Sequence, residues 1–327
     1  MHRQFLCKEF VYIVAFVRIS YGVLRVRHFL TLKEYSREEI KDMILCALEF
    51  KRKRQSLKNI SFTGKSIALI FEKPSTRTRA SMIVAAHQLG ILPVIYNWNE
   101  LQLGRGEPIK DTARVLSRYH DILAARVYRH ETLEELAVYS SVPVINMLSD
   151  LFHPLQALAD FMTIYEKFGS FENVNVAFVG DGRDNVLNSL LIIATKLGVE
   201  IRVVSPINYW PTEEFLRELK NEKVFLTDDP IEAVKGANVI YTDVFVSMGQ
   251  ESEREERLKV FLPKYQVNEK VLRYAAPDYI FMHCLPAKRG QEVTDEVIED
   301  KEHSVVWDQA ENRLYTAKAV LSKLLSC

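Results

Sequence analysis

The sequence predicts an α/β protein built from two doubly wound parallel-sheet domains that are linked by long helices. From about residue 66, short β-branched runs alternate with stretches of helical spacing. The alternation comes in two sets, which are separated near residues 166–174. A chain of 327 residues is also long enough for two domains with separate cores. Alternation repeated this often implies parallel strands with helices covering both faces of each sheet.

The first set begins after residue 65 and contains four apolar runs short enough to be buried strands. We expect these strands at residues 66–71, 92–97, 121–127 and 142–147. Stretches with helical spacing separate them, at residues 76–90, 109–119 and 131–140. A long helix is expected over residues 153–168, where the chain leaves this set.

The second set repeats the pattern, with strands expected at residues 174–181, 200–206, 238–245 and 279–286. Its helices are expected at residues 185–198, 212–220 and 230–237. A last helix, at about 310–325, follows the second sheet and is expected to pack back on the first domain. The expected division is therefore an extension at 1–29, a first domain at 30–164 that includes helix 308–327, and a second domain at 165–307.

Composition excludes several classes of protein. Lys and Arg number 43, as do Asp and Glu, so no basic field indicates nucleic acid and no membrane partner is expected. The cysteines are scattered and show no metal-ligand spacing, which indicates a reducing compartment and no structural zinc: Cys7, Cys46, Cys284 and Cys327.

Residues 1–29 differ from the rest, because Arg and Lys surround the apolar run FVYIVAF and Glu9 is the one acid. That run is far too short to span a bilayer. A signal or transit segment is one interpretation, and an extension without a part in the chemistry is the other. The second is favoured, because the segment has few serines and no small-residue cleavage site.

The stretch FEKPSTRTRA, residues 71–80, places hydroxyl groups and arginines where a strand passes into a helix. Ser75 or Thr76 is expected to cap that helix. A helix N-terminus binds phosphate or carboxylate, and the Arg77 guanidinium matches phosphate oxygens. The alternative is a capped helix with surface arginines. The stretch lacks the glycines of a nucleotide-binding loop.

Four motifs in order resemble those of the ornithine carbamoyltransferase family. They are STRTR at 75–79, HPLQ at 153–156, DVFVSMGQ at 243–250 and HCLP at 283–286. The first two are shared across carbamoyltransferases, and the last two are more specific to the ornithine branch. The similarity runs from about residue 28 to the C-terminus.

The resemblance implies a carbamoyl phosphate site and a set of residues that act in catalysis. Attack of an amine on the carbamoyl carbon builds negative charge on the carbonyl oxygen, which prepositioned donors stabilise. His153 and Gln156 are expected to donate to the carbamoyl group. The implied catalytic residues are Arg126, His153, Asp243 and Cys284. The implied carbamoyl phosphate ligands are Ser75, Thr76, Arg77, Thr78, Gln102, Arg126, His153, Gln156, Cys284, Leu285 and Arg313.

The second domain is expected to bind ornithine, and the implied ligands are Asn185, Asp243, Ser247 and Met248. A carboxylate at Asp243 suits a substrate ammonium, whereas a helix cap is its ordinary structural role. The stretch GDGRDNVLNS at 180–189 lacks the third glycine of a dinucleotide-binding turn. Asp184 stands where the family usually has an asparagine.

The implied activity is transfer of the carbamoyl group of carbamoyl phosphate to L-ornithine, giving L-citrulline and phosphate. No metal or organic cofactor is expected. Gln102 resembles a residue that reaches a neighbouring subunit, which implies a homotrimer or an assembly of trimers, and the family implies a cytoplasmic enzyme of arginine metabolism. Two alternatives remain: another acceptor, such as aspartate or putrescine, and a catalytically silent homologue. Asp243 argues against a dicarboxylate, and the filled motif positions argue against silence.

Overall fold

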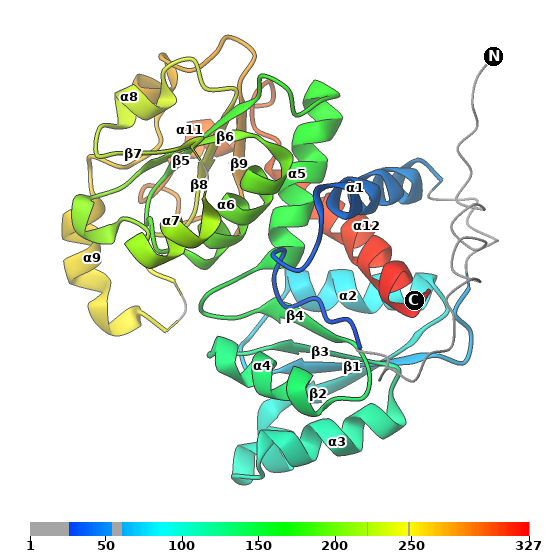
Figure 1. Ribbon diagram of the computed structural model, residues 1–327. Coiled ribbons are helices and arrows are strands. Elements are labelled where there is room, and N and C mark those ends of the chain that lie inside the picture. Colours follow the sequence, from blue (N-terminus) through cyan, green and yellow to red (C-terminus); the bar gives the residue numbers. More distant parts are fainter. Residues whose placement is uncertain (1–25, 54–60, 221, 248, 327) are drawn as a thin grey trace, which may run out of the picture.

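Two parallel sheets organise the protein, one in each half of the chain (Figure 1). The computed structural model describes residues 26–53, 61–220, 222–247 and 249–326. The first sheet has the order β2-β1-β3-β4. Its strands are β1 (Ser66–Phe71), β2 (Leu92–Asn97), β3 (Ile122–Arg126) and β4 (Val144–Leu148). The second sheet has the order β7-β6-β5-β8-β9, and all pairs in both sheets are parallel. The predicted fold class is confirmed.

Helices cover both faces of the first sheet because its strands are apolar on both sides. Ile67 and Leu69 of β1 pack into the same cluster as residues of α2 (Arg77–Gln88). Ala68 and Ile70 point the other way and pack with residues of α3 (Ile109–Tyr119) and α4 (His130–Tyr139). Alternate side chains of a strand face opposite sides of its sheet, so each face requires its own layer of helices.

The second sheet is larger and includes one strand that the sequence patterns miss. Its strands are β5 (Asn175–Val179), β6 (Glu200–Val204), β7 (Val224–Thr227), β8 (Val239–Thr242) and β9 (Ile280–His283). β7 is missed because it is a short, incompletely buried edge strand. Its helices are α6 (Asn185–Leu197), α7 (Glu213–Leu219), α8 (Pro230–Val234), α9 (Arg254–Phe261), α10 (Glu269–Leu272) and α11 (Asp295–Ile298).

Three helices join the halves of the chain. α5 (Pro154–Phe168) runs between the two sheets, so a domain change at residue 165 falls inside this helix (Figure 1). α12 (Val306–Leu325) packs against α2, α5 and α1 (Arg37–Arg52), which is the expected return to the first domain. α1 was not among the expected helices, although Ser36 and Glu39 form a capping box at its start.

The last residues of the predicted extension belong to the first half of the fold. Phe29 is fully buried, and its backbone forms a parallel bridge with Ile145 of β4. Arg27 forms an ion pair with Glu39 and lies over the Tyr35 ring. Arg27 and Phe29 therefore belong to the first domain and not to the extension that was predicted for residues 1–29. Among the described residues no helix is long and apolar enough to cross a membrane.

The order of strands reverses at one point in each sheet, between β1 and β3 and between β5 and β8. In parallel α/β folds, ligands bind beyond the carboxyl ends of the strands at such points. The STRTR stretch follows β1, Arg126 ends β3, and Asp243 follows β8. The candidate residues therefore gather where the two halves of the chain meet.

Candidate active site

The STRTR stretch presents an open helix N-terminus. Thr76 occupies the N-cap position of α2, but its side chain makes no capping hydrogen bond. The prediction that Ser75 or Thr76 caps this helix is therefore wrong for Thr76, and no capping bond from Ser75 is present among the described residues. Thr76 is exposed and Ser75 is half-buried, whereas Thr78 is buried. The backbone amides in the first turn of α2 therefore have no capping side chain, and the positive end of the helix dipole is open to an anion.

Arginines from three segments surround Thr78. Its Oγ1 accepts a hydrogen bond from Arg313 Nη2 of α12 at 2.6 Å and one from Arg126 Nη1 of β3 at 3.5 Å. Each of these arginines is 6% exposed. We call Arg77, Arg126 and Arg313 the cation cluster. None of the three has an ion-pair partner among the described residues, and buried cations require an anion.

The electrostatics of the cation cluster are those of an anion site. Burial, followed by Arg313 and Arg77, lowers the pKa of Arg126 to about 10. Burial likewise lowers the pKa of Arg313 to about 10. Both guanidiniums therefore stay charged at neutral pH, under mutual repulsion that a bound phosphate would relieve.

His153, directly before α5, is a neutral donor beside the cation cluster. Burial and the charges of Arg313, Arg126 and Arg77 hold the pKa of His153 well below its ordinary value. Arg313 Nη2 lies 3.5 Å from His153 Nε2, so Nε2 is the acceptor and Nδ1 carries the hydrogen. Nδ1 is buried and has no partner among the described residues. It is the atom free to donate to a carbonyl oxygen.

Gln156, in the first turn of α5, is bound so that its amide oxygen is the free atom. Its Nε2 donates to Asp160 Oδ1 at 2.8 Å. Its Oε1 is buried without a hydrogen-bond partner in the described part of the chain. Nε2 keeps a second N–H beside the one given to Asp160, so donation by Gln156 to the carbamoyl group stays a prediction, and Oε1 is a further atom that could accept from a ligand.

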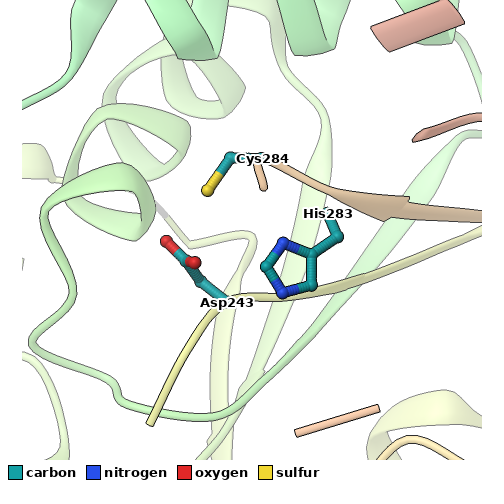
Figure 2. A group of neighbouring side chains, drawn as sticks. All are labelled: Asp243, His283 and Cys284. Atoms are coloured by element: carbon teal, nitrogen blue, oxygen red, sulfur yellow. The ribbon is translucent and has the colours of Figure 1, made fainter. Parts of the chain in front are cut away.

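Asp243 and Cys284 lie side by side because β8 and β9 are paired with Thr242 opposite His283. Figure 2 shows the Cys284 sulfur directed toward the Asp243 carboxylate. The two side chains are hydrogen-bonded, and the Val244 amide donates to Asp243 Oδ1 at 2.7 Å. Burial and the nearby carboxylates raise the pKa of Cys284 well above its ordinary value, so the group is a thiol that donates to Asp243.

His283 lies within the same group, which brings together three side chains of kinds that bind metals (Figure 2). Their ligand atoms are within 4.8 Å of one another. However, His283 Nδ1 accepts the Leu285 amide at 2.9 Å, and its Nε2 is 3.1 Å from Glu292 Oε1. His283 therefore has no lone pair left for a metal, and two ligands do not make a site. The imidazole instead holds Leu285, whose φ of 58° is left-handed.

Asp184 and Asn185 begin α6 at the same edge of the second sheet. Asp184 caps the helix by accepting from the Val186 amide at 2.8 Å and the Leu187 amide at 3.1 Å. Burial, Asp243 and Asp181 raise its pKa well above the ordinary value. An asparagine would cap equally well, so what Asp184 adds is a second titratable carboxyl group near Asp243. We call Asp184 and Asp243 the acidic pair.

The remaining predicted ligands are less well placed. Asn185 Nδ2 donates to the Ser149 carbonyl at 2.6 Å, which leaves its other amide hydrogen and Oδ1. The Ser247 amide donates to Gln250 Oε1 at 3.0 Å, so its hydroxyl is the group that remains. Met248 lies outside the described residues. Gln102 is exposed at the start of a 3-10 turn (Gln102–Arg105) that follows β2, and its side chain makes no hydrogen bond among the described residues.

Several residues of the site were missed by sequence reasoning. Lys73 is 4% exposed, and its Nζ lies 4.5 Å from the Tyr128 ring centre. Asp160 is fully buried, and it accepts from Tyr241 and Gln309 as well as from Gln156. The spacing of four residues between Gln156 and Asp160 on one predicted helix was the available signal.

The fold is thus a pair of parallel-sheet α/β domains, with a cation cluster suited to an anion in the first and an acidic pair at the strand ends of the second. Residues 27–166 match the domain described as "Aspartate/ornithine carbamoyltransferase, carbamoyl-P binding domain". Residues 172–324 match "Aspartate/ornithine carbamoyltransferase, Asp/Orn binding domain". The chain belongs to the aspartate/ornithine carbamoyltransferase family.

Individual relatives support the same assignment. The ornithine carbamoyltransferase of Hyperthermus butylicus is 55% identical over 313 residues, which cover 93% of this chain and 99% of that protein. The structure of ornithine carbamoyltransferase from Pyrococcus furiosus has a TM-score of 0.84 and 52% identity, covering 91% of this chain and 96% of that one. The Thermus thermophilus structure has a TM-score of 0.82 at 44% identity, covering 90% and 98%.

Proposed function

We propose that this protein is an ornithine carbamoyltransferase, which transfers the carbamoyl group of carbamoyl phosphate to the δ-amine of L-ornithine. The products are L-citrulline and phosphate. The observation that carries the proposal is the meeting of a cation cluster with an acidic pair where the two halves of the chain join. The two halves are in direct contact at the site, because the His153 amide beside the cation cluster donates to Ser189 Oγ of α6, the helix that Asp184 caps, at 2.8 Å.

The phosphate of the donor lies at the N-terminus of α2, where Ser75, Thr76 and Arg77 are presented. The Thr78 hydroxyl accepts from Arg313, so its own hydrogen is free to donate to the ligand. Arg126 and the Nδ1–H of His153 polarise the carbamoyl oxygen. These donors are held before reaction begins, so they stabilise the developing oxyanion without reorganising.

The acceptor must lose a proton before it reacts, because the δ-ammonium of ornithine resembles lysine, with a pKa of about 10.4 in water. The positive field of the cation cluster favours the neutral amine. The amine nitrogen then bonds to the carbamoyl carbon, and the bond from that carbon to the phosphate oxygen breaks. The second proton lost by the nitrogen leaves with the phosphate. Asp243 and the Leu285 carbonyl orient the amine, and Cys284 needs no covalent part.

The acidic pair favours ornithine over aspartate. The ammonium groups of ornithine stabilise the ionised forms of Asp184 and Asp243, whose pKa values are raised by burial, whereas a dicarboxylate would disfavour those forms further. Asp181 does not add to this field freely, because it is paired with Arg257. Asn185 and Ser247 retain donors for the α-carboxylate, which putrescine lacks. Ornithine is thus the acceptor that uses all of these groups.

We further propose a homotrimer in the cytoplasm that acts in arginine metabolism. The exposed position of Gln102 suits a residue that completes the carbamoyl phosphate site of a neighbouring subunit. No metal or organic cofactor has a part in the proposed chemistry. Sedimentation of the purified chain tests the assembly: a stable monomer with full activity would exclude a shared site.

The activity is tested by incubating the protein with carbamoyl phosphate and, separately, with ornithine, aspartate or putrescine. Carbamoylated products are then measured by mass spectrometry. We expect citrulline, with kcat/KM for ornithine at least about a hundredfold above either competitor. A larger value for putrescine would move the proposal to that acceptor, and no product with any amine would favour a silent homologue.

A further inference from the structure

Both polar atoms of the Gln156 side-chain amide are buried, but only the nitrogen has a hydrogen-bond partner among the described residues. Gln156 is 1% exposed. Its Nε2 is bound to Asp160 Oδ1 at 2.8 Å, and its Oε1 has no partner in the described residues. A buried amide oxygen without a hydrogen bond is costly, so its position is explained if a ligand supplies a donor there.

Both carboxylate oxygens of Asp160 accept hydrogen bonds from neighbouring side chains. Its Oδ1 accepts from Gln156 Nε2 and from Gln309 Nε2 at 2.7 Å, and its Oδ2 accepts from the Tyr241 hydroxyl at 3.0 Å. Asp160 is fully buried one turn after Gln156 on α5. Because Oδ1 accepts from two amide nitrogens and Oδ2 from a hydroxyl, the Gln156 NH₂ is held toward Asp160 and its Oε1 is directed away.

Gln309 connects the Asp160 carboxylate to the second domain by hydrogen bonds. Gln309 Oε1 accepts the His283 amide at 2.9 Å, and its Nε2 also lies 3.1 Å from the Tyr241 hydroxyl. Cys284 directly follows His283. Asp160 therefore links the donor side of the site, on α5, with the acceptor side, at the end of β9.

We propose that Asp160 is a positioning residue that fixes Gln156 with its amide oxygen toward the carbamoyl NH₂ of the donor. The inference rests on the proposed function, because the carbamoyl NH₂ supplies the N–H that Oε1 lacks. It also assigns specificity: the site selects donors with an amide nitrogen over those with an oxygen at that place. Without Asp160, the amide of Gln156 could turn and offer N–H groups instead.

The inference is tested by calorimetric titration of the full chain with three probes. Phosphonoacetamide carries the amide of carbamoyl phosphate, phosphonoacetate carries a carboxylate at the same place, and inorganic phosphate reports on the cation cluster alone. With Oε1 facing the ligand, the unaltered protein binds phosphonoacetamide more tightly than phosphonoacetate by on the order of tenfold or more.

Three variants separate positioning from packing. Asp160→Leu has a similar shape but no acceptor, and we expect the preference for the amide to fall to about twofold or less while phosphate affinity stays within about threefold. Asp160→Asn can still turn an oxygen to Gln156, so it should keep the preference. Tyr241→Phe is the matched control, since it removes the donor to Oδ2 and leaves Oδ1 and Gln156 in place.

Several results would overturn the inference: full preference in Asp160→Leu, lost preference in Asp160→Asn with unchanged phosphate binding, or equal affinity of the unaltered protein for both analogues. If Asp160→Leu does not fold, neutron diffraction of the deuterated unaltered protein decides. Deuterium on the Gln156 atom facing Asp160 supports the assignment, and an oxygen there overturns it. Failure of the proposed function looks different, because neither analogue would then bind more tightly than inorganic phosphate.

Discussion

Removing Arg77 should weaken the phosphate site while relieving repulsion within it. Burial, followed by the charges of Arg313 and Arg77, lowers the pKa of Arg126 from its ordinary value to about 10. Since one pKa unit corresponds to about 1.36 kcal/mol, the charged state of Arg126 is disfavoured by roughly 3 kcal/mol, with burial the largest cause. Arg77→Met removes one repelling charge, so the protein without ligand should be no less stable.

Affinity for the donor should change in the opposite direction. Loss of a charged hydrogen bond to phosphate costs about 2 to 4 kcal/mol, and the half-buried position of Arg77 favours the lower end. We expect phosphonoacetamide to bind at least about thirtyfold more weakly by calorimetry. Thermal unfolding with and without ligand should show less stabilisation by ligand.

The neighbouring Arg79 provides the control. Its Nη2 donates to Asn97 Oδ1 at 2.8 Å, and its guanidinium lies over the Phe71 ring, so it faces β2. Arg79→Met should leave the affinity for phosphonoacetamide within about threefold. Unchanged affinity in Arg77→Met, or an equal loss in both variants, would refute the reasoning.

Three more predictions follow from the acceptor side and the chain start. Asp243→Asn keeps shape and removes charge, so steady-state kinetics should show a higher KM for ornithine and a lower kcat, with the KM for carbamoyl phosphate nearly unchanged; an unaltered ornithine response would place the acceptor elsewhere. Burial raises the pKa of Asp243, so ornithine binding should be lost as pH falls through a pKa above that of an ordinary aspartate, about 3.9. The acid limb of the kcat/KM profile for ornithine should therefore disappear in Asp243→Asn, and an unchanged limb in that variant would contradict the assignment. A chain beginning at residue 26 should keep its activity, whereas one beginning at residue 30 loses the buried Phe29 and roughly 1.5 to 3 kcal/mol of stability, as measured by urea unfolding.

Most of the fold could be predicted from the sequence because the central strands are apolar on both faces and read as unbroken runs. Polar residues directly after such strands could be assigned to one site, since parallel strands end at a common edge. Edge strand β7 could not be predicted, because an incompletely buried strand has no such run. α1 was missed although its capping box was present in the sequence.

The details of the site depended on contacts that no local pattern records. Asp160 and Gln309 are 149 residues apart, and their bond exists because α5 and α12 pack together. The unpartnered oxygen of the Gln156 amide follows from that contact, so the sequence motif alone could not indicate it. The Asn185 bond to the Ser149 carbonyl likewise depends on how the two halves meet.

The central claim is that the cation cluster and the acidic pair hold two substrates together for reaction. It is tested most directly with L-ornithine whose δ-nitrogen is acylated by phosphonoacetate, a single ligand that spans both sides. We predict that calorimetry will show binding at least about a hundredfold tighter than that of phosphonoacetamide, and that Arg77→Met and Asp243→Asn will each weaken it. Binding no tighter than that of phosphonoacetamide, or binding indifferent to Asp243→Asn, would contradict the claim.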